Sequence, residues 1–139
     1  MEIIGIYNKF MQCGVVATDS RALKGGEMFF ALKGENFDGN EYAMKALESG
    51  AAYAVVNRDA AVASSDDPRL IKVDDSLKTL QELARWHRSM MIVDGKPLTV
   101  IAVTGLDRRA DAVKEIRGVL SEKYSVTATE DGQNDGVGV

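Results

Sequence analysis

Hydrophobic and polar positions along the chain predict helices and strands in turn. From 2 to 12 the apolar residues recur at the spacing of one helix face, at Ile3, Ile4, Tyr7, Phe10 and Met11. Four segments have the length of strands: 15–20, which runs into a polar turn, the apolar runs 27–32 and 51–56, and the alternating segment 69–73. Because strands that are apolar at every position suit burial on both faces, the pattern predicts a sheet with helices on each side.

Helix start and stop signals lie between these runs. Asp38 precedes a periodic segment over 40–49 that ends at Gly50, and Asp74 or Asp75 precedes a longer one that continues to about residue 91. The longer helix is predicted to bury a stripe made of Leu77, Leu80, Ala84, His87 and Met91.

The turn-like stretch "VDGKP", at 93–97, is the predicted domain boundary. After it the pattern predicts a strand over 98–103, a helix over 107–122 and a strand over 124–129. We therefore expect an α/β protein with one domain over 1–95 and the start of another over 96–139. Two strands and one helix do not make a stable sheet domain, so they must extend the first sheet, pack on it or pair with another chain.

Composition narrows the classes of partner. The formal net charge is −4, which argues against a nucleic-acid surface, and the longest apolar runs are too short for a membrane span. The single cysteine, Cys13, excludes an internal disulfide framework and indicates a reducing, cytoplasmic compartment. The single histidine, His87, excludes a histidine-rich metal site, and we expect no metal ligands.

Two polar stretches in the first half carry candidate chemistry. In "TDSR", at 18–21, Ser20 offers a donor and an acceptor, and Arg21 offers a fork for a phosphate or carboxylate. Asp19 either orients Arg21 or closes an Asx-turn, and a plain turn with a surface ion pair explains these letters equally well.

The second stretch is "KGENFDGN", at 33–40, where Gly34 and Gly39 let the backbone bend around a small group. Asn36 can pair with a base or amide edge. Phe37 either stacks on a flat ring or fills the core, and the residues alone favour neither.

The segment "TVIAVTGLDRRADAVKEI", at 99–116, has the strand, turn and helix that frame a phosphate-binding loop. Such a loop needs a second glycine, a lysine and a Ser or Thr, and those positions hold Arg108, Arg109 and Ala110. Without glycine at 108 we expect the backbone to avoid positive φ. The residues favour an ordinary helix start capped by Asp107, with anion binding at Arg109 as the alternative.

Residues 18–56 resemble the N-terminal domain of the Mur ligase family, most closely its D-alanyl-D-alanine-adding members. The resemblance rests on Asp-Ser-Arg, Gly-Glu-x-Phe-Phe-Ala-Leu-x-Gly, Asp-Gly and Gly-Ala, in this order and spacing. Residues 73–88 resemble the helix that closes that domain, and "VIAVTG", at 100–105, resembles the first strand of the family's central ATPase domain. The match continues through 115–130 and so covers nearly the whole chain.

The resemblance implies that the N-terminal domain holds the UDP part of a UDP-N-acetylmuramoyl peptide, while the intact family uses ATP and Mg²⁺ to make an acyl-phosphate. It places the uridine nucleotide against Thr18, Ser20, Glu35, Asn36 and Phe37. It also implies that Arg21, Lys33 and Asp38 support that site.

The second half departs from the family pattern. The family loop reads Thr-Gly-x-Asn-Gly-Lys-Thr-Thr, and only Thr104 and Gly105 match it, because Arg108, Arg109 and Ala110 replace the working residues. A later family pattern is largely altered at 129–138, and the chain ends before the rest of the ATPase domain. We therefore expect ligand binding without ligase activity, no catalytic residue and no cofactor. The alternatives are a residual phosphate binder, or a structural or interaction protein, dimeric through 98–129.

Overall fold

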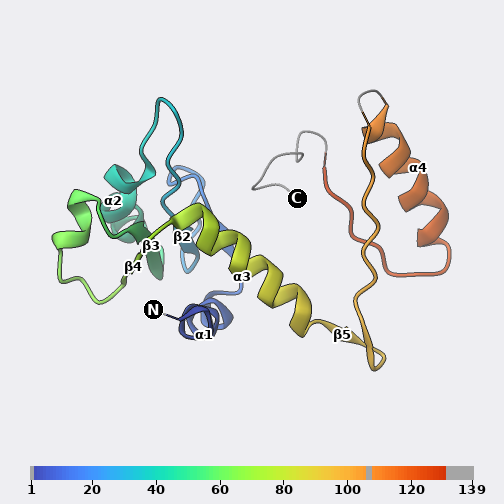
Figure 1. The fold of residues 1–139 in the computed structure, drawn as a ribbon, viewed down its shortest axis with the longest axis horizontal. Helices are drawn as coiled ribbons and strands as arrows, with labels where there is room; N and C mark the ends of the chain where they lie inside the picture. The colour runs from blue at the N-terminus through green and yellow to red at the C-terminus, as the bar shows by residue number, and fades with distance from the viewer. Residues whose placement is uncertain (1, 106–107, 131–139) are drawn as a thin grey trace. The chain divides into compact units, whose positions relative to one another are not determined.

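The computed structural model describes residues 2–105 and 108–130, and the chain divides into two compact units, Met1–Met91 (unit 1) and Ile92–Val139 (unit 2). Unit 1 contains a four-stranded sheet built from β1 (Val16–Ala17), β2 (Met28–Phe30), β3 (Tyr53–Asn57) and β4 (Leu70–Val73). The spatial order is β1-β2-β3-β4, and every neighbouring pair is parallel (Figure 1). The strands therefore lie side by side in the order in which they occur along the chain.

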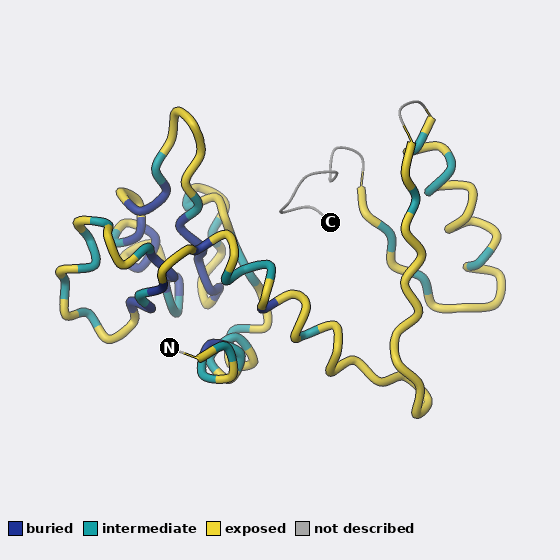
Figure 2. Tube along the Cα trace, viewed as in Figure 1, coloured by how far each residue is buried: buried dark blue, intermediate teal, exposed yellow. Residues whose placement is uncertain are grey.

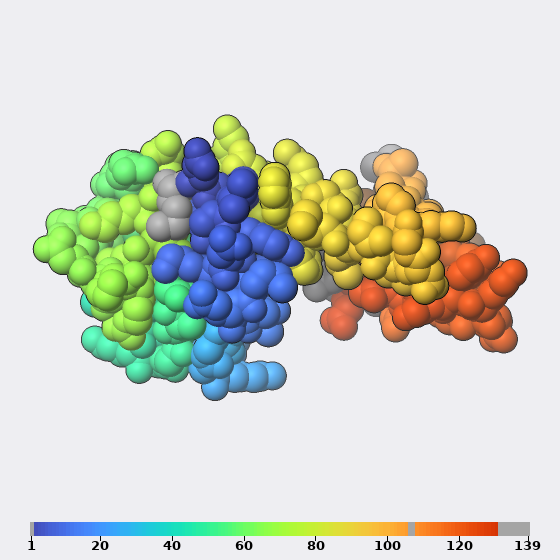
Figure 3. All heavy atoms as spheres, turned by 90° about the horizontal axis from the view of Figure 1, so that it is seen from below, coloured from blue at the N-terminus to red at the C-terminus, as the bar shows by residue number. Residues whose placement is uncertain are grey.

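Helices cover both faces of this sheet. Helices α1 (Ile3–Cys13) and α3 (Ser76–Met90) pack on one face and against each other, and they form one continuous surface in Figure 3. The other face carries α2 (Ala43–Glu48) and two 3-10 helices, η1 (Gly39–Tyr42) and η2 (Ala61–Ser64). The predicted α/β class, a sheet flanked by helices, is confirmed.

Strand β2 shows why its sequence is apolar at every position. Met28 and Phe30 pack with α1 and α3, whereas Phe29 and the following Ala31 pack with α2. The exposed fraction of all four is 1% or less, and the buried residues gather in the sheet in Figure 2. Burial of a large apolar side chain contributes about 1.5–3 kcal/mol, so this strand anchors both halves of the core.

Both predicted helix N-caps are confirmed, and the structure adds one detail to each. Asp38 accepts a hydrogen bond from the Asn40 backbone N–H at 2.9 Å, but the helix begins as η1 before continuing as α2. Asp75, rather than Asp74, caps α3 by accepting from the Lys78 N–H at 2.9 Å.

The predicted buried stripe of α3 is partly wrong. Leu77, Ala84 and Met91 are exposed, whereas Leu83 is 2% exposed and lies in the core. The packed face consists of Ser76, Leu80, Leu83 and His87. Its first member is polar, so apolar periodicity alone could not identify this face.

Unit 2 contains α4 (Arg109–Ser121) and a hairpin of β5 (Ile92–Val93) and β6 (Lys96–Pro97). The described residues of 98–103 and 124–129 are not in strands, which contradicts the predicted strand-helix-strand order. A strand exists through hydrogen bonds to a neighbouring strand, and neither segment has one within the described part of unit 2. Accordingly none of residues 92–105 and 108–130 is buried.

Candidate functional site

The carboxyl ends of the four parallel strands meet at one edge of the sheet, where ligands of open α/β folds bind. Two of the segments that leave this edge are those the sequence singled out. Residues 18–21 follow β1, and residues 31–40 follow the neighbouring β2. The fold therefore brings "TDSR" and "KGENFDGN" to the same edge.

Residues 33–38 form a closed loop. Lys33 and Asp38 are joined by an antiparallel bridge, and within it the Gly34 N–H donates to the Phe37 carbonyl at 2.8 Å. The Gly39 N–H donates to the Leu32 carbonyl at 2.8 Å. A Cβ at residue 39 would lie 2.6 Å from the same carbonyl oxygen, so only glycine allows this close approach.

A cleft of about 320 Å³ opens against this loop. It is lined by Lys33, Gly34, Glu35, Asn36, Phe37, Asp38, Glu41 and Tyr42. Phe37 is 52% exposed and stacks on Tyr42, with ring centroids 5.4 Å apart and planes inclined by 18°. Phe37 therefore does not fill the core, and the cleft presents an aromatic face to solvent.

The "TDSR" turn lies at the same edge of the sheet as this cleft and does not line it. Arg21 donates from Nε and Nη2 to the Asp19 carboxylate, and its backbone N–H donates to Oδ1 at 2.9 Å. Both roles that the sequence suggested for Asp19 therefore occur together. Hydrogen bonds from the Arg21 side chain lower the pKa of Asp19 from 3.8 to about 2. The same side-chain hydrogen bonds raise the pKa of the Arg21 guanidinium.

The remaining predicted site residues lie at the surface. Thr18 is exposed and Ser20 is half-buried, and no side-chain hydrogen bond joins either to the cleft among the described residues. Lys33 Nζ lies 4.0 Å from Asp38 Oδ2. The Asp38 pKa is lowered, first by hydrogen bonds from Asn40 and to a smaller degree by Lys33, so this carboxylate is charged at neutral pH.

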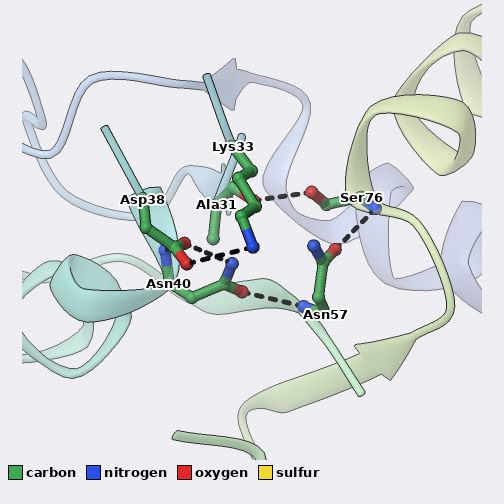
Figure 4. Close-up of polar contacts among 6 residues, drawn as sticks. All are labelled: Ala31, Lys33, Asp38, Asn40, Asn57 and Ser76. Carbon is green, nitrogen blue, oxygen red and sulfur yellow. Dashed lines mark hydrogen bonds and ion pairs between the residues drawn. The ribbon is translucent and has the colours of Figure 1, made fainter. Parts of the chain in front are cut away.

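Three residues that sequence reasoning missed connect the loop to the sheet and to α3 (Figure 4). Asn40 donates from Nδ2 to Asp38 Oδ1 at 2.6 Å and accepts from the Asn57 N–H at 2.8 Å. Asn57 Oδ1 accepts from the Ser76 N–H at 2.9 Å, and Ser76 Oγ donates to the Ala31 carbonyl at 2.6 Å. Isolated amides and a serine carry no sequence period, so no pattern could have identified them.

A larger hollow of about 390 Å³ lies between α1 and the start of α3. Its charged residues include Arg58 and Asp74, which pair with each other at 2.9 Å. That hollow contains none of the predicted site residues, so the smaller cleft is the better candidate. Among the described residues, no cluster of His, Cys, Asp or Glu is arranged to hold a metal ion, and no helix is long and apolar enough to cross a bilayer.

The loop before α4 corrects one expectation. Arg108 adopts φ 57°, a left-handed conformation, although we expected positive φ to require glycine. A side chain at such a position costs about 1–2 kcal/mol, and the structure adopts it at the position where a phosphate-binding loop needs its second glycine. The predicted cap at Asp107 lies outside the described residues, and so does the altered segment 129–138 from residue 131 on.

The described residues of this loop do not fit a magnesium–nucleotide site. Arg109 Nη1 donates to the Gly105 carbonyl at 3.4 Å, and Arg108 pairs with Asp111 at 3.5 Å. Ala110 offers no hydroxyl where a Ser or Thr would reach the metal. Thr104 and Gly105, the two matching residues, are both exposed.

Comparisons with known proteins give one consistent result. Residues 13–91 match the family model "Mur ligase family, catalytic domain". The UDP-N-acetylmuramoyl-tripeptide–D-alanyl-D-alanine ligase of Bacillus subtilis is 33% identical over 124 residues, which are 89% of this chain and 26% of that protein. The Escherichia coli ligase of the same name is 34% identical over 124 residues, covering 89% of this chain and 25% of that protein.

Among solved structures, the MurF ligase of Thermotoga maritima in complex with ADP is similar, with a TM-score of 0.75 and 27% identity. The match covers 89% of this chain and 27% of that one. The chain thus spans about a quarter of the length of the relatives it matches.

Proposed function

The chain belongs to the Mur ligase family, and from that premise we propose that unit 1 binds a UDP-N-acetylmuramoyl-tripeptide, the compound for which its relatives are named. The observation that carries the proposal is the exposed Phe37–Tyr42 stack that lines the cleft, at the same edge of the sheet as Arg21. An exposed aromatic face suits a planar base, and a guanidinium suits a phosphate.

The side chains at this edge suit different parts of the ligand. The Phe37 ring offers the surface for the uracil, and the Asn36 amide can donate to and accept from its polar edge. Arg21 Nε and Nη2 both donate to the Asp19 carboxylate, which fixes the plane of the guanidinium. The third nitrogen, Nη1, is then available for a diphosphate oxygen. Lys33, at the start of the cleft loop, adds a positive charge.

We further propose that this chain binds without ligating. Arg109 and Ala110 replace the lysine and the hydroxyl that would engage ATP and Mg²⁺, so a residual phosphate site at Arg108 and Arg109 is the weaker alternative. Calorimetric titrations with the UDP-linked peptide and, separately, with Mg²⁺–ATP distinguish peptide binding from a residual phosphate site. We expect binding heat with the peptide and none with Mg²⁺–ATP.

The direct test is titration of the chain with UDP-N-acetylmuramoyl-tripeptide, followed by amide NMR. We expect shifts near Ser20 and Asn36, and Phe37→Ala should weaken binding by about fivefold or more, because stacking of a base on an aromatic ring is worth about 1–3 kcal/mol. Tyr124→Ala, at an exposed aromatic of unit 2, is the control and should bind normally. No shift at millimolar ligand rejects the proposal.

A role in self-association is the second candidate. Val100, Ile101 and Val119 of unit 2 have exposed fractions of 56%, 58% and 74%. Apolar side chains this exposed favour a partner surface. Sedimentation velocity tests it: a monomer at all concentrations counts against a dimer formed through 98–129.

A further inference from the structure

The polar network at the carboxyl edge links three segments that are distant in sequence. It runs from Asp38 through Asn40 to Asn57 at the end of β3, and then to Ser76 at the first turn of α3 (Figure 4). Ser76 closes it by donating to the Ala31 carbonyl at the end of β2. The side chains of Asn40, Asn57 and Ser76, which do not line the cleft, therefore connect the cleft loop to β3, to α3 and to the end of β2.

The Asn40 amide has only one orientation that satisfies its partners. The Asp38 carboxylate only accepts and the Asn57 backbone N–H only donates, so Nδ2 must face the first and Oδ1 the second. Asn40 is 4% exposed and Ser76 is 2% exposed. Removing one partner would leave buried polar groups without a hydrogen bond, which makes this linkage stiff.

We propose that Asn40 is a positioning residue that, through Asp38 and Asn57, holds loop 33–38 in its ligand-ready conformation. The inference rests on the proposed function, because the ligand of the loop is taken to be the UDP-linked peptide. Asn40 does not line the cleft, so it acts on the ligand only through Asp38 and the loop.

Two variants of the 139-residue chain test this positioning role. Asn40→Ala removes both side-chain hydrogen bonds and should weaken binding of UDP-N-acetylmuramoyl-tripeptide about tenfold. Asn40→Asp keeps the shape but sets a second carboxylate against Asp38, so it should bind weakly at pH 8. At pH 5 a shared proton restores the missing donor, and binding should recover for Asn40→Asp and not for Asn40→Ala.

Other charged groups near this edge, Lys33, Glu41, Arg58, Asp74 and Asp75, are common to all variants, so each affinity is compared with the unaltered chain at the same pH. Leu83→Ala is the control for lost stability, because Leu83 is buried two turns along α3 and contacts no network residue through a hydrogen bond. It should lower the melting temperature without changing the affinity of the folded chain.

A second measurement keeps this inference separate from the proposed function. Without ligand, the ¹⁵N heteronuclear NOE of the amides at 34–37 should fall in Asn40→Ala and stay unchanged in Leu83→Ala. Unchanged NOE values in Asn40→Ala overturn the inference, and so does equal peptide affinity. If the unaltered chain binds no peptide, the proposed function fails, and the NOE values alone decide whether Asn40 orders the loop.

Discussion

Arg21 holds Asp19 with two side-chain hydrogen bonds, from Nε to Oδ1 at 2.9 Å and from Nη2 to Oδ2 at 2.8 Å. The Arg21 backbone N–H donates to the same Oδ1 at 2.9 Å. One carboxylate therefore restrains the backbone of the turn and the guanidinium together. The turn can present Arg21 in a fixed direction although both side chains lie at the surface.

This pair gives unit 1 a defined acid dependence. The Asp19 pKa falls from 3.8 to about 2 on folding, so the unfolded chain binds the proton more tightly. The contribution to stability is present above pH 4 and is lost as the pH falls from about 4 to 2. A carboxyl ¹³C titration should show the low pKa, and Arg21→Gln should return it toward 3.8.

The two glycines of "KGENFDGN", Gly34 in the cleft loop and Gly39 just after it, should respond in opposite ways to alanine. A Cβ at Gly39 would lie 2.6 and 2.8 Å from backbone atoms of Leu32, which cannot move aside, so Gly39→Ala should cost about 1–3 kcal/mol. At Gly34 the nearest atom would be 3.9 Å away, so Gly34→Ala should be neutral or stabilise by up to about 1 kcal/mol. Urea denaturation followed by Trp86 fluorescence measures both, and equal effects would contradict the close approach at residue 39.

The left-handed residue before α4 should be improved by glycine. Arg108 has φ 57°, so Arg108→Gly removes about 1 kcal/mol of backbone strain and sacrifices only an exposed 3.5 Å ion pair with Asp111. Its readout is hydrogen exchange of the Ala112 amide, which donates to the Arg108 carbonyl at 3.0 Å and should become about fivefold more protected. The matched variant Arg117→Gly, inside α4, should lower protection instead.

The corrected packing of α3 gives another matched pair. Leu83 is 2% exposed and Leu77 is 36% exposed, although both stand in the same helix. Leu83→Ala should therefore cost about 2–5 kcal/mol and Leu77→Ala much less. Thermal melts of the two variants provide the comparison. A larger loss of stability in Leu77→Ala would instead support the buried stripe that apolar spacing predicted.

These cases show what sequence patterns can and cannot predict here. Residues 28–30 and residues 98–103 are similar apolar runs, but only the first has a strand on each side to pair with. Pairing is a property of the neighbours rather than of the run, so the second prediction was wrong. Asp38 was predicted as a cap because its effect is local, within two residues.

The sequence predicted some residues of the cleft but not the network that supports it. Phe37 was recognised as a candidate from its glycine-flanked loop, but whether it faced the core or the solvent depended on Tyr42, five residues away. Asn40, Asn57 and Ser76 were missed because each is ordinary in its own segment. They become a unit only when β2, β3 and α3 meet at one edge.

The strands of unit 1 lie in the sheet in the order in which they are synthesised, and this affects how the unit can fold during synthesis. Each strand pairs with the one synthesised just before it, so the sheet can grow as the chain leaves the ribosome, without rearrangement. Helix α1 is different, because its partner α3 is the final element of the unit. The first helix to be synthesised is therefore the last to be fully covered, because Leu83, which shares a core with Ile6, follows it by 83 − 6 = 77 residues.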